Sequence, residues 1–203
     1  SWKGIPTLFL YSLCVVSAFS LDVLMVKHYF PPAEAGLFIA ASTLAKMTAV
    51  IIWPITTVAY SFFCDAEAKR EKTSTLLWRG GRFILLFTLV LLAAVVMFPD
   101  SIIRITYGAD FATAAPLLVP AFLAFIPTSF TSLLCNYHLS KHRESFVYGL
   151  SLGCVLQFLF ILCFHSSLIA VFWASALGII SQLILCAFTG LLDRHTQPPT
   201  IHN

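Results

Sequence analysis

Two ionisable residues, Asp22 and Lys46, lie well inside apolar stretches of the sequence and are the first candidates for chemistry in an apolar environment. A charge at the centre of a membrane helix costs at least about 2.5 to 3.5 kcal/mol, so each should face protein or water and have a partner. Measured from the connection between their stretches, Asp22 is roughly 9 Å deep and Lys46 roughly 16 Å, a difference that the Lys stem can span. Two interpretations stay open: a structural ion pair, or a cavity-lining pair that contributes to binding or coupling.

Two glutamines, Gln157 and Gln182, form a second candidate pair. Small residues recur at every fourth position around each of them, a spacing that lets helices approach closely in lipid. The two series are Ser145, Gly149, Gly153 and Gln157, and Ala170, Ala174, Gly178, Gln182, Cys186 and Gly190. Because both glutamines lie about 15 to 16 Å from the same end of their helices, we predict that they face each other and share a hydrogen bond. That contact would hold the helices together or line a cavity.

The sequence shows no constellation of residues for catalysis or metal binding. It contains no DDxxD-type cluster, no GxSxG, no P-loop and no carboxylates paired at the spacing of an active site. His138 and His142 have the i, i+4 spacing of metal ligands, but no acid or Cys joins them and neighbouring cations repel a metal ion. Six scattered cysteines without a CxxC indicate neither a disulfide framework nor a zinc site. We therefore expect no enzyme, no metal and no cofactor.

The composition is that of a protein whose main solvent is lipid. Of 203 residues, 59% are hydrophobic and only 10% are charged, and the mean hydropathy is +0.91. Soluble domains average about 45–50% apolar and 25% charged residues, so this balance excludes a soluble enzyme, a disordered tail and a nucleic-acid binder. We therefore expect an integral membrane protein.

Six apolar stretches are long enough to cross a bilayer as helices. Strands would have to alternate in polarity and close into a barrel, whereas these stretches are continuous. They predict an all-α membrane protein with helices at about 5–28, 35–63, 83–98, 111–138, 146–165 and 168–192, followed by a cytoplasmic tail at 193–203. Pro32 and Glu34 suit a helix N-terminus, and Asp110 is expected to cap the fourth helix. Four prolines are predicted inside helices, where they favour bends: Pro54, Pro116, Pro120 and Pro127.

The distribution of cations predicts the side on which each connection lies, because short cytoplasmic loops are enriched in Lys and Arg. With the N-terminus inside, nine cations fall on the inner side and two, Lys27 and Arg104, fall on the outer side. The prediction is an N-in and C-in topology, with Lys27 and Arg104 near an outer mouth. The charged stretch from Asp65 to Arg82 is expected to form a short amphipathic segment on the inner surface.

Several short segments carry a family resemblance. They are Leu21–Phe30, Glu34–Phe38 and Ala41–Lys46, with Tyr107–Phe111 further along the chain. The first three resemble the seventh and eighth helices of polysaccharide-type flippases, which belong to the multidrug/oligosaccharidyl-lipid/polysaccharide exporter superfamily. The fourth is similar to the family's glycine-acid-Phe turn ahead of its tenth helix. One departure is that Cys64 follows Phe63, where such proteins often have a proline.

This resemblance implies a larger, MATE-like transporter with two lobes that form a V around a central cavity. The chain would be its C-terminal six-helix lobe, a piece of a longer protein that lacks the N-terminal lobe. Such proteins move lipid-linked oligosaccharide or polysaccharide precursors across the cytoplasmic membrane by alternating access. The substrate would be an anionic lipid-linked glycan, with H⁺ or Na⁺ as candidate coupling ions. Lys46 is the first candidate for substrate contact and Asp22 for ion coupling or for holding Lys46.

Two other functions stay open. A cation-coupled multidrug antiporter of the same superfamily would have an acidic and aromatic cavity. A membrane-bound transferase acting on lipid-linked sugars would break a bond in its substrate.

Overall fold

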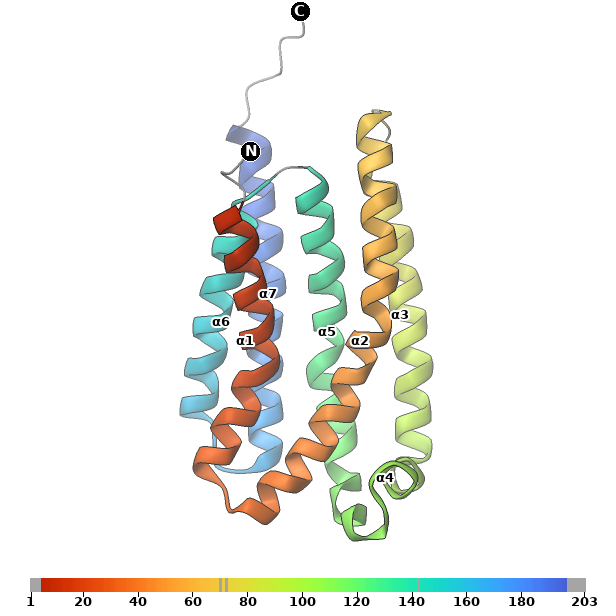
Figure 1. The fold of residues 1–203 in the computed structure, drawn as a ribbon, viewed down its shortest axis with the longest axis vertical. Coiled ribbons are helices and arrows are strands. Elements are labelled where there is room, and N and C mark those ends of the chain that lie inside the picture. The colour runs from red at the N-terminus through yellow and green to blue at the C-terminus, as the bar shows by residue number, and fades with distance from the viewer. Residues whose placement is uncertain (1–4, 70, 72, 142, 197–203) are drawn as a thin grey trace, which may run out of the picture.

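The computed structural model describes residues 5–69, 71, 73–141 and 143–196, and Figure 1 shows them as a bundle of long helices. The elements are α1 (Ile5–Tyr29), α2 (Pro32–Ala68), α3 (Thr73–Met97), α4 (Pro99–Tyr107), the 3₁₀ helix η2 (Ala109–Ala114), α5 (Ala115–Ser140), α6 (Phe146–Cys163) and α7 (Leu168–Thr196). Six of the described helical segments are long and apolar enough to cross a membrane. The prediction of an all-α fold with six candidate membrane spans is therefore confirmed.

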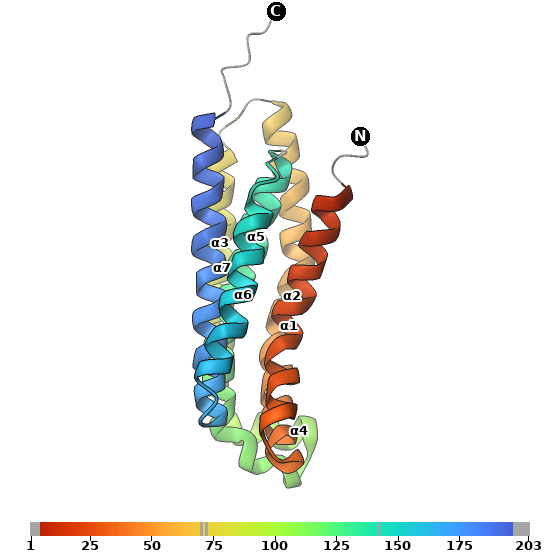
Figure 2. The ribbon, with the colours of Figure 1, turned by 90° about the vertical axis from the view of Figure 1, so that its left-hand side faces the viewer.

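The two ends of the bundle differ in what they carry. The start of α1, the end of α7 and the connections after α2 and α5 lie together at one end, here called the termini end (Figures 1 and 2). The connections after α1 and α6 lie at the opposite end with α4 and η2, and this is called the α4 end. Lys27, near the end of α1, and Arg104, on α4, are both exposed there. The side of a membrane that each end faces stays a prediction.

The prediction that Asp65 to Arg82 form a separate amphipathic segment is wrong. α2 is 37 residues long, or about 55 Å, which is more than the roughly 30 Å of a bilayer core. It continues to Ala68, and α3 begins at Thr73, so most of the stretch extends these two helices. The reason is that its polar groups pair across helices: Thr73 donates a hydrogen bond to Glu67 at 3.2 Å, and Lys141 donates to the same carboxylate at 2.8 Å.

The segment before α5 contains an additional helix. α4 begins at Pro99, whose missing N–H is no loss in the first turn of a helix, and ends at Tyr107. Gly108 follows, and its φ of +91° favours glycine. Because η2 follows, α5 begins only at Ala115, and Pro116 lies in its first turn and not in its interior. Asp110 lies in the first turn of η2, where no side-chain capping bond forms, so the predicted cap is wrong.

Other boundaries agree or shift by a few residues. Pro32 and Glu34 occupy the first turn of α2 as predicted, and Pro54, Pro120 and Pro127 lie inside helices. α7 continues to Thr196, so the predicted tail is helical at 193–196, and 197–203 lie outside the described residues.

α5 is the central helix of the bundle and packs against α2, α3 and α7. α6 packs mainly on α7, and α1 packs mainly on α6. α1 and α2 are joined at the α4 end and diverge toward the termini end (Figure 1). Stacking of Phe38 on Phe172, with ring centroids 4.2 Å apart, helps to close the apolar core between α2 and α7.

The predicted contact between α6 and α7 is confirmed. The Gln182 amide donates a hydrogen bond to Gln157 Oε1 at 2.9 Å, and the Gln157 amide donates to the Ala18 carbonyl of α1 at 3.2 Å. Glycines make this approach possible, because a Cβ on Gly153 would lie 2.7 Å from Gln182 Cα and a Cβ on Gly178 would lie 2.6 Å from Gln157 Cα. Each glutamine therefore packs against a glycine of the other helix.

Substitution of these glycines should separate α6 from α7. We expect Gly153→Ala and Gly178→Ala each to lower the free energy of unfolding by about 1–3 kcal/mol, because the new methyl group meets backbone atoms that cannot move aside. Thermal unfolding of the full protein in detergent measures the change. Gly81→Ala on α3 is the control, since a Cβ there has nothing within 4 Å. Equal effects at Gly153 and Gly81 would contradict the close-packing explanation.

Candidate functional site

Asp22 and Lys46 form a buried ion pair between α1 and α2. Lys46 Nζ donates to both carboxylate oxygens of Asp22 at 2.8 Å and to the Phe19 carbonyl at 2.6 Å. The Ser42 hydroxyl donates to Asp22 Oδ2 at 3.0 Å. Asp22 is fully buried, and the Lys46 side chain is 12% exposed. The predicted partner of each charge is therefore present.

The ammonium of Lys46 is saturated in this arrangement. An ammonium group has three N–H donors, and the oxygens of Asp22 and the Phe19 carbonyl occupy them. The Phe125 ring of α5 lies 4.8 Å from Nζ and adds a cation–π contact. Lys46 can therefore bind an external anion only if it gives up part of its bonding to Asp22.

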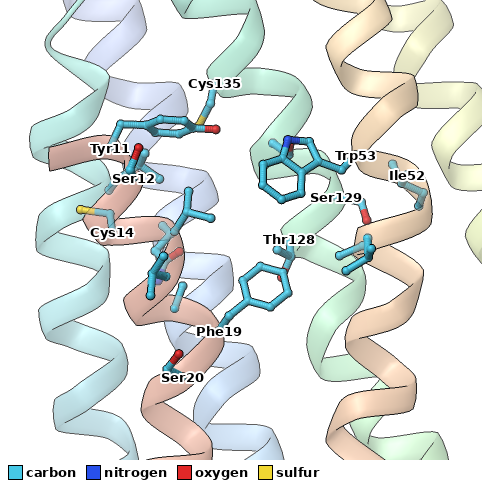
Figure 3. A pocket seen from close by; sticks show the side chains of 18 residues that line it. Tyr11, Ser12, Cys14, Phe19, Ser20, Ile52, Trp53, Thr128, Ser129 and Cys135 are labelled. Carbon is cyan, nitrogen blue, oxygen red and sulfur yellow. The ribbon is translucent and has the colours of Figure 1, made fainter. Parts of the chain in front are cut away.

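A cavity of about 370 Å³ adjoins this ion pair on the side of the termini end. Its walls come from α1 and α2, and α5 forms its floor (Figure 3). Phe19 projects into it from α1 and Trp53 from α2. The lining is mainly apolar, with a few polar groups from serine, threonine, tyrosine and glutamine side chains, so the cavity suits an amphiphilic or hydrocarbon ligand better than a bare sugar.

The structure brings some of the predicted site residues together at this cavity. Phe19 both lines the cavity and accepts the Lys46 hydrogen bond, which places the ion pair at the cavity's edge. Gln182 lines the cavity, and Gln157 supports it through their hydrogen bond. Lys27 and Arg104 do not line the cavity; both are exposed at the α4 end.

Several lining residues had no sequence signal as site residues. Tyr11, Trp53, Thr128 and Ser129 lie in apolar stretches, where their types are common and carry no motif. Two internal prolines could have marked the position, because Trp53 precedes Pro54 and Thr128 follows Pro127 in the chain. A proline inside a helix removes a backbone hydrogen bond and bends the helix.

Two histidines, His138 and His142, were considered above as a metal-binding pair, and the structure describes only the first of them. His138 is buried, and its ring stacks on Phe146 with centroids 5.7 Å apart. His142 lies outside the described residues. Among the residues that are described, no group of three or more His, Cys, Asp or Glu is placed to hold a metal ion.

Breaking the buried ion pair should be costly. We expect Asp22→Asn to lower the free energy of unfolding by about 3–5 kcal/mol, because the ammonium stays buried without a carboxylate. The double variant Asp22→Asn/Lys46→Met should recover most of this loss, since no charge is then left unpaired. Chemical unfolding of the full protein measures both.

The exposed pair between Glu67 and Lys141, with N and O also 2.8 Å apart, is the matched control. Glu67→Gln should cost at most about 1 kcal/mol, because solvent screens that pair. A loss in Asp22→Asn no larger than in Glu67→Gln would show that the buried pair has no special structural role.

Comparison with known proteins assigns a family. Residues 5–116, from α1 into the first turn of α5, match the profile of the family described as polysaccharide biosynthesis protein. This match includes Asp22, Lys46 and the α1 and α2 walls of the cavity. No curated protein and no solved structure matched the chain. With more than half of its length matched, this chain belongs to the polysaccharide biosynthesis protein family.

Proposed function

We propose that the protein is a transporter that flips lipid-linked oligosaccharide or polysaccharide precursors across the cytoplasmic membrane by alternating access. Membership of a polysaccharide biosynthesis family and six apolar helices support a membrane protein of that process. The single observation that carries the transport proposal is the Lys46–Asp22 pair at the edge of an apolar cavity. A lipid-linked precursor with an anionic group needs both a cation and an apolar surface.

The mechanism we infer is an exchange of partners at Lys46. The anionic group of the substrate would replace Asp22 at the ammonium, whose donors are otherwise all used within the protein. Asp22 would then need another positive partner, and H⁺ or Na⁺ can serve as one. Loading of substrate and uptake of a coupling ion would thereby be linked through one carboxylate.

A multidrug antiporter fits this site less well. Binding of cationic drugs calls for carboxylates that face the cavity without an internal partner. The one buried carboxylate of the described residues, Asp22, is matched by Lys46, and no Asp or Glu is among the described residues that line the cavity.

We also propose that the protein breaks no bond in its substrate. The titratable side chains among the described lining residues are those of Tyr11, Cys14 and Cys135, in largely apolar surroundings. Translocation needs only a cavity and two conformations. In this proposal the six-helix unit works as the C-terminal lobe beside an N-terminal lobe of the same chain.

The transport role of Lys46 can be separated from its structural role. In the complete protein, Asp22→Asn/Lys46→Met leaves no buried charge unpaired but removes the ammonium. We expect export of the lipid-linked glycan to fall by about 10-fold or more, since a hydrogen bond to a charged group contributes about 1.5–3 kcal/mol. Appearance of glycan on the outer leaflet of vesicles is the readout. Lys69→Met, at an exposed position of the termini end, is the control. Unchanged export in the double variant would remove Lys46 from the site.

The orientation can be tested with two cysteines at opposite ends of the bundle. Cys163 is the exposed last residue of α6 at the α4 end, whereas Cys64 lies near the end of α2 at the termini end. In variants that retain one cysteine each, a membrane-impermeant maleimide added outside should label Cys163 in intact cells. Cys64 should react only after the membrane is opened. The reverse pattern would overturn the N-in and C-in topology.

A further inference from the structure

Two hydroxyl groups on the cavity floor are buried without a hydrogen-bond partner. They belong to Thr128 and Ser129 of α5, for which the described part of the chain supplies no partner. Both residues line the cavity, as Figure 3 shows, and Ser129 is only 2% exposed. Leaving a buried hydroxyl unpaired costs about 1–3 kcal/mol. Such groups point to a ligand that supplies the missing bonds.

Other helical hydroxyls satisfy themselves locally. Thr131 donates to the Pro127 carbonyl at 3.0 Å, and Thr88 donates to the Ile84 carbonyl at 2.8 Å. Ser132, also at the cavity, lies 3.2 Å from the Thr56 hydroxyl of α2. Thr128 and Ser129 have neither kind of contact, so their O–H groups form no hydrogen bond within the described part of the protein.

The hydroxyl-bearing residues and the ion pair are linked through Phe125 and the cavity. Ser129 follows Phe125 by four residues on α5, which is one helical turn or about 6 Å. The Phe125 ring lies 4.8 Å from Lys46 Nζ. Phe19, whose carbonyl accepts from Lys46, lines the same cavity as Thr128 and Ser129, so the two hydroxyl-bearing residues and the ion pair adjoin one cavity.

We propose that Thr128 and Ser129 form, with Lys46, a binding site for a phosphate or diphosphate ester. The hydroxyls donate to phosphate oxygens, and the ammonium balances part of the charge. The apolar lining from Phe19, Ile52 and Trp53 favours an ester whose alcohol is a hydrocarbon chain. This assignment rests on the proposed function, because Lys46 must exchange Asp22 for the ligand. It adds two substrate-contacting residues from a helix segment beyond the matched family region.

Binding to the purified full protein in nanodiscs tests the proposal. The probes are farnesyl diphosphate, farnesol and inorganic diphosphate. We expect Thr128→Ala/Ser129→Ala to weaken binding of farnesyl diphosphate by about 10-fold, the effect of losing about 1.4 kcal/mol, and to leave farnesol binding unchanged. Thr128→Ser/Ser129→Thr keeps both hydroxyls and should bind farnesyl diphosphate like the wild type.

Ser175→Ala is the matched control, because the Ser175 hydroxyl on α7 is also buried and unpartnered in the described chain but does not line the cavity. It should change no affinity. Weaker binding of both diphosphates in the alanine double variant would show that the site recognises the phosphate group itself. Weaker binding of farnesyl diphosphate alone would show that the hydrocarbon chain is also required, and either result supports the proposal.

The proposal is overturned if the alanine double variant binds farnesyl diphosphate as tightly as the wild type, or if Ser175→Ala loses as much affinity. Failure of the proposed function has a different signature. A protein that binds the diphosphate through these hydroxyls but moves no lipid-linked glycan between leaflets would retain the site and lose the flippase assignment.

Discussion

A polar group inside a lipid bilayer must find its partner within the protein, because no water is available there to replace one. In this bundle the requirement is strictest at Asp22, a fully buried carboxylate. Its oxygens accept from Lys46 and Ser42, and Lys46 also donates to the Phe19 carbonyl. This cluster ties α1 to α2 beside α5, and beyond it, toward the termini end, the cavity separates the two helices.

The cavity lies where regular helix packing is interrupted. Pro54 in α2 and Pro127 in α5 each leave the preceding turn without one backbone hydrogen bond, and both adjoin cavity-lining residues. On the side of the termini end, α2 and α5 are held together again, because the Asn136 amide donates to the Thr56 carbonyl at 3.0 Å. A bent segment between two fixed contacts gives space for a ligand without loosening the bundle.

The two polar pairs of the membrane helices differ in charge and in surroundings. The Gln157–Gln182 pair is neutral and packed against glycines, and it also reaches the Ala18 carbonyl, so it joins α6, α7 and α1 into one unit. The Asp22–Lys46 pair carries two opposite charges beside an open cavity, where an anion and a cation could each replace one partner. In the transport mechanism that we propose, the first pair is a rigid element and the second is the site that changes its bonding.

The amino-acid sequence alone determined the class of the protein and its main polar contacts. Continuous apolar stretches specify helices in lipid, isolated buried charges require partners, and small residues at every fourth position specify a close helix contact, since all three effects act within or between neighbouring helices. The end of α2 is also held by a cross-helix bond between Lys141 and Glu67, which are 74 residues apart, and no local pattern records such a contact.

Tertiary structure alone decided where the cavity lies and which residues with hydroxyl groups line it. Thr128 and Ser129 resemble any other helical hydroxyl residues in sequence, and only the packing of α5 behind the cavity shows that they have no partner within the described part of the chain. Tertiary structure also showed that Lys46 has no donor to spare. A residue type states which bonds a group can form, whereas the packing of distant segments determines which of those bonds are already made.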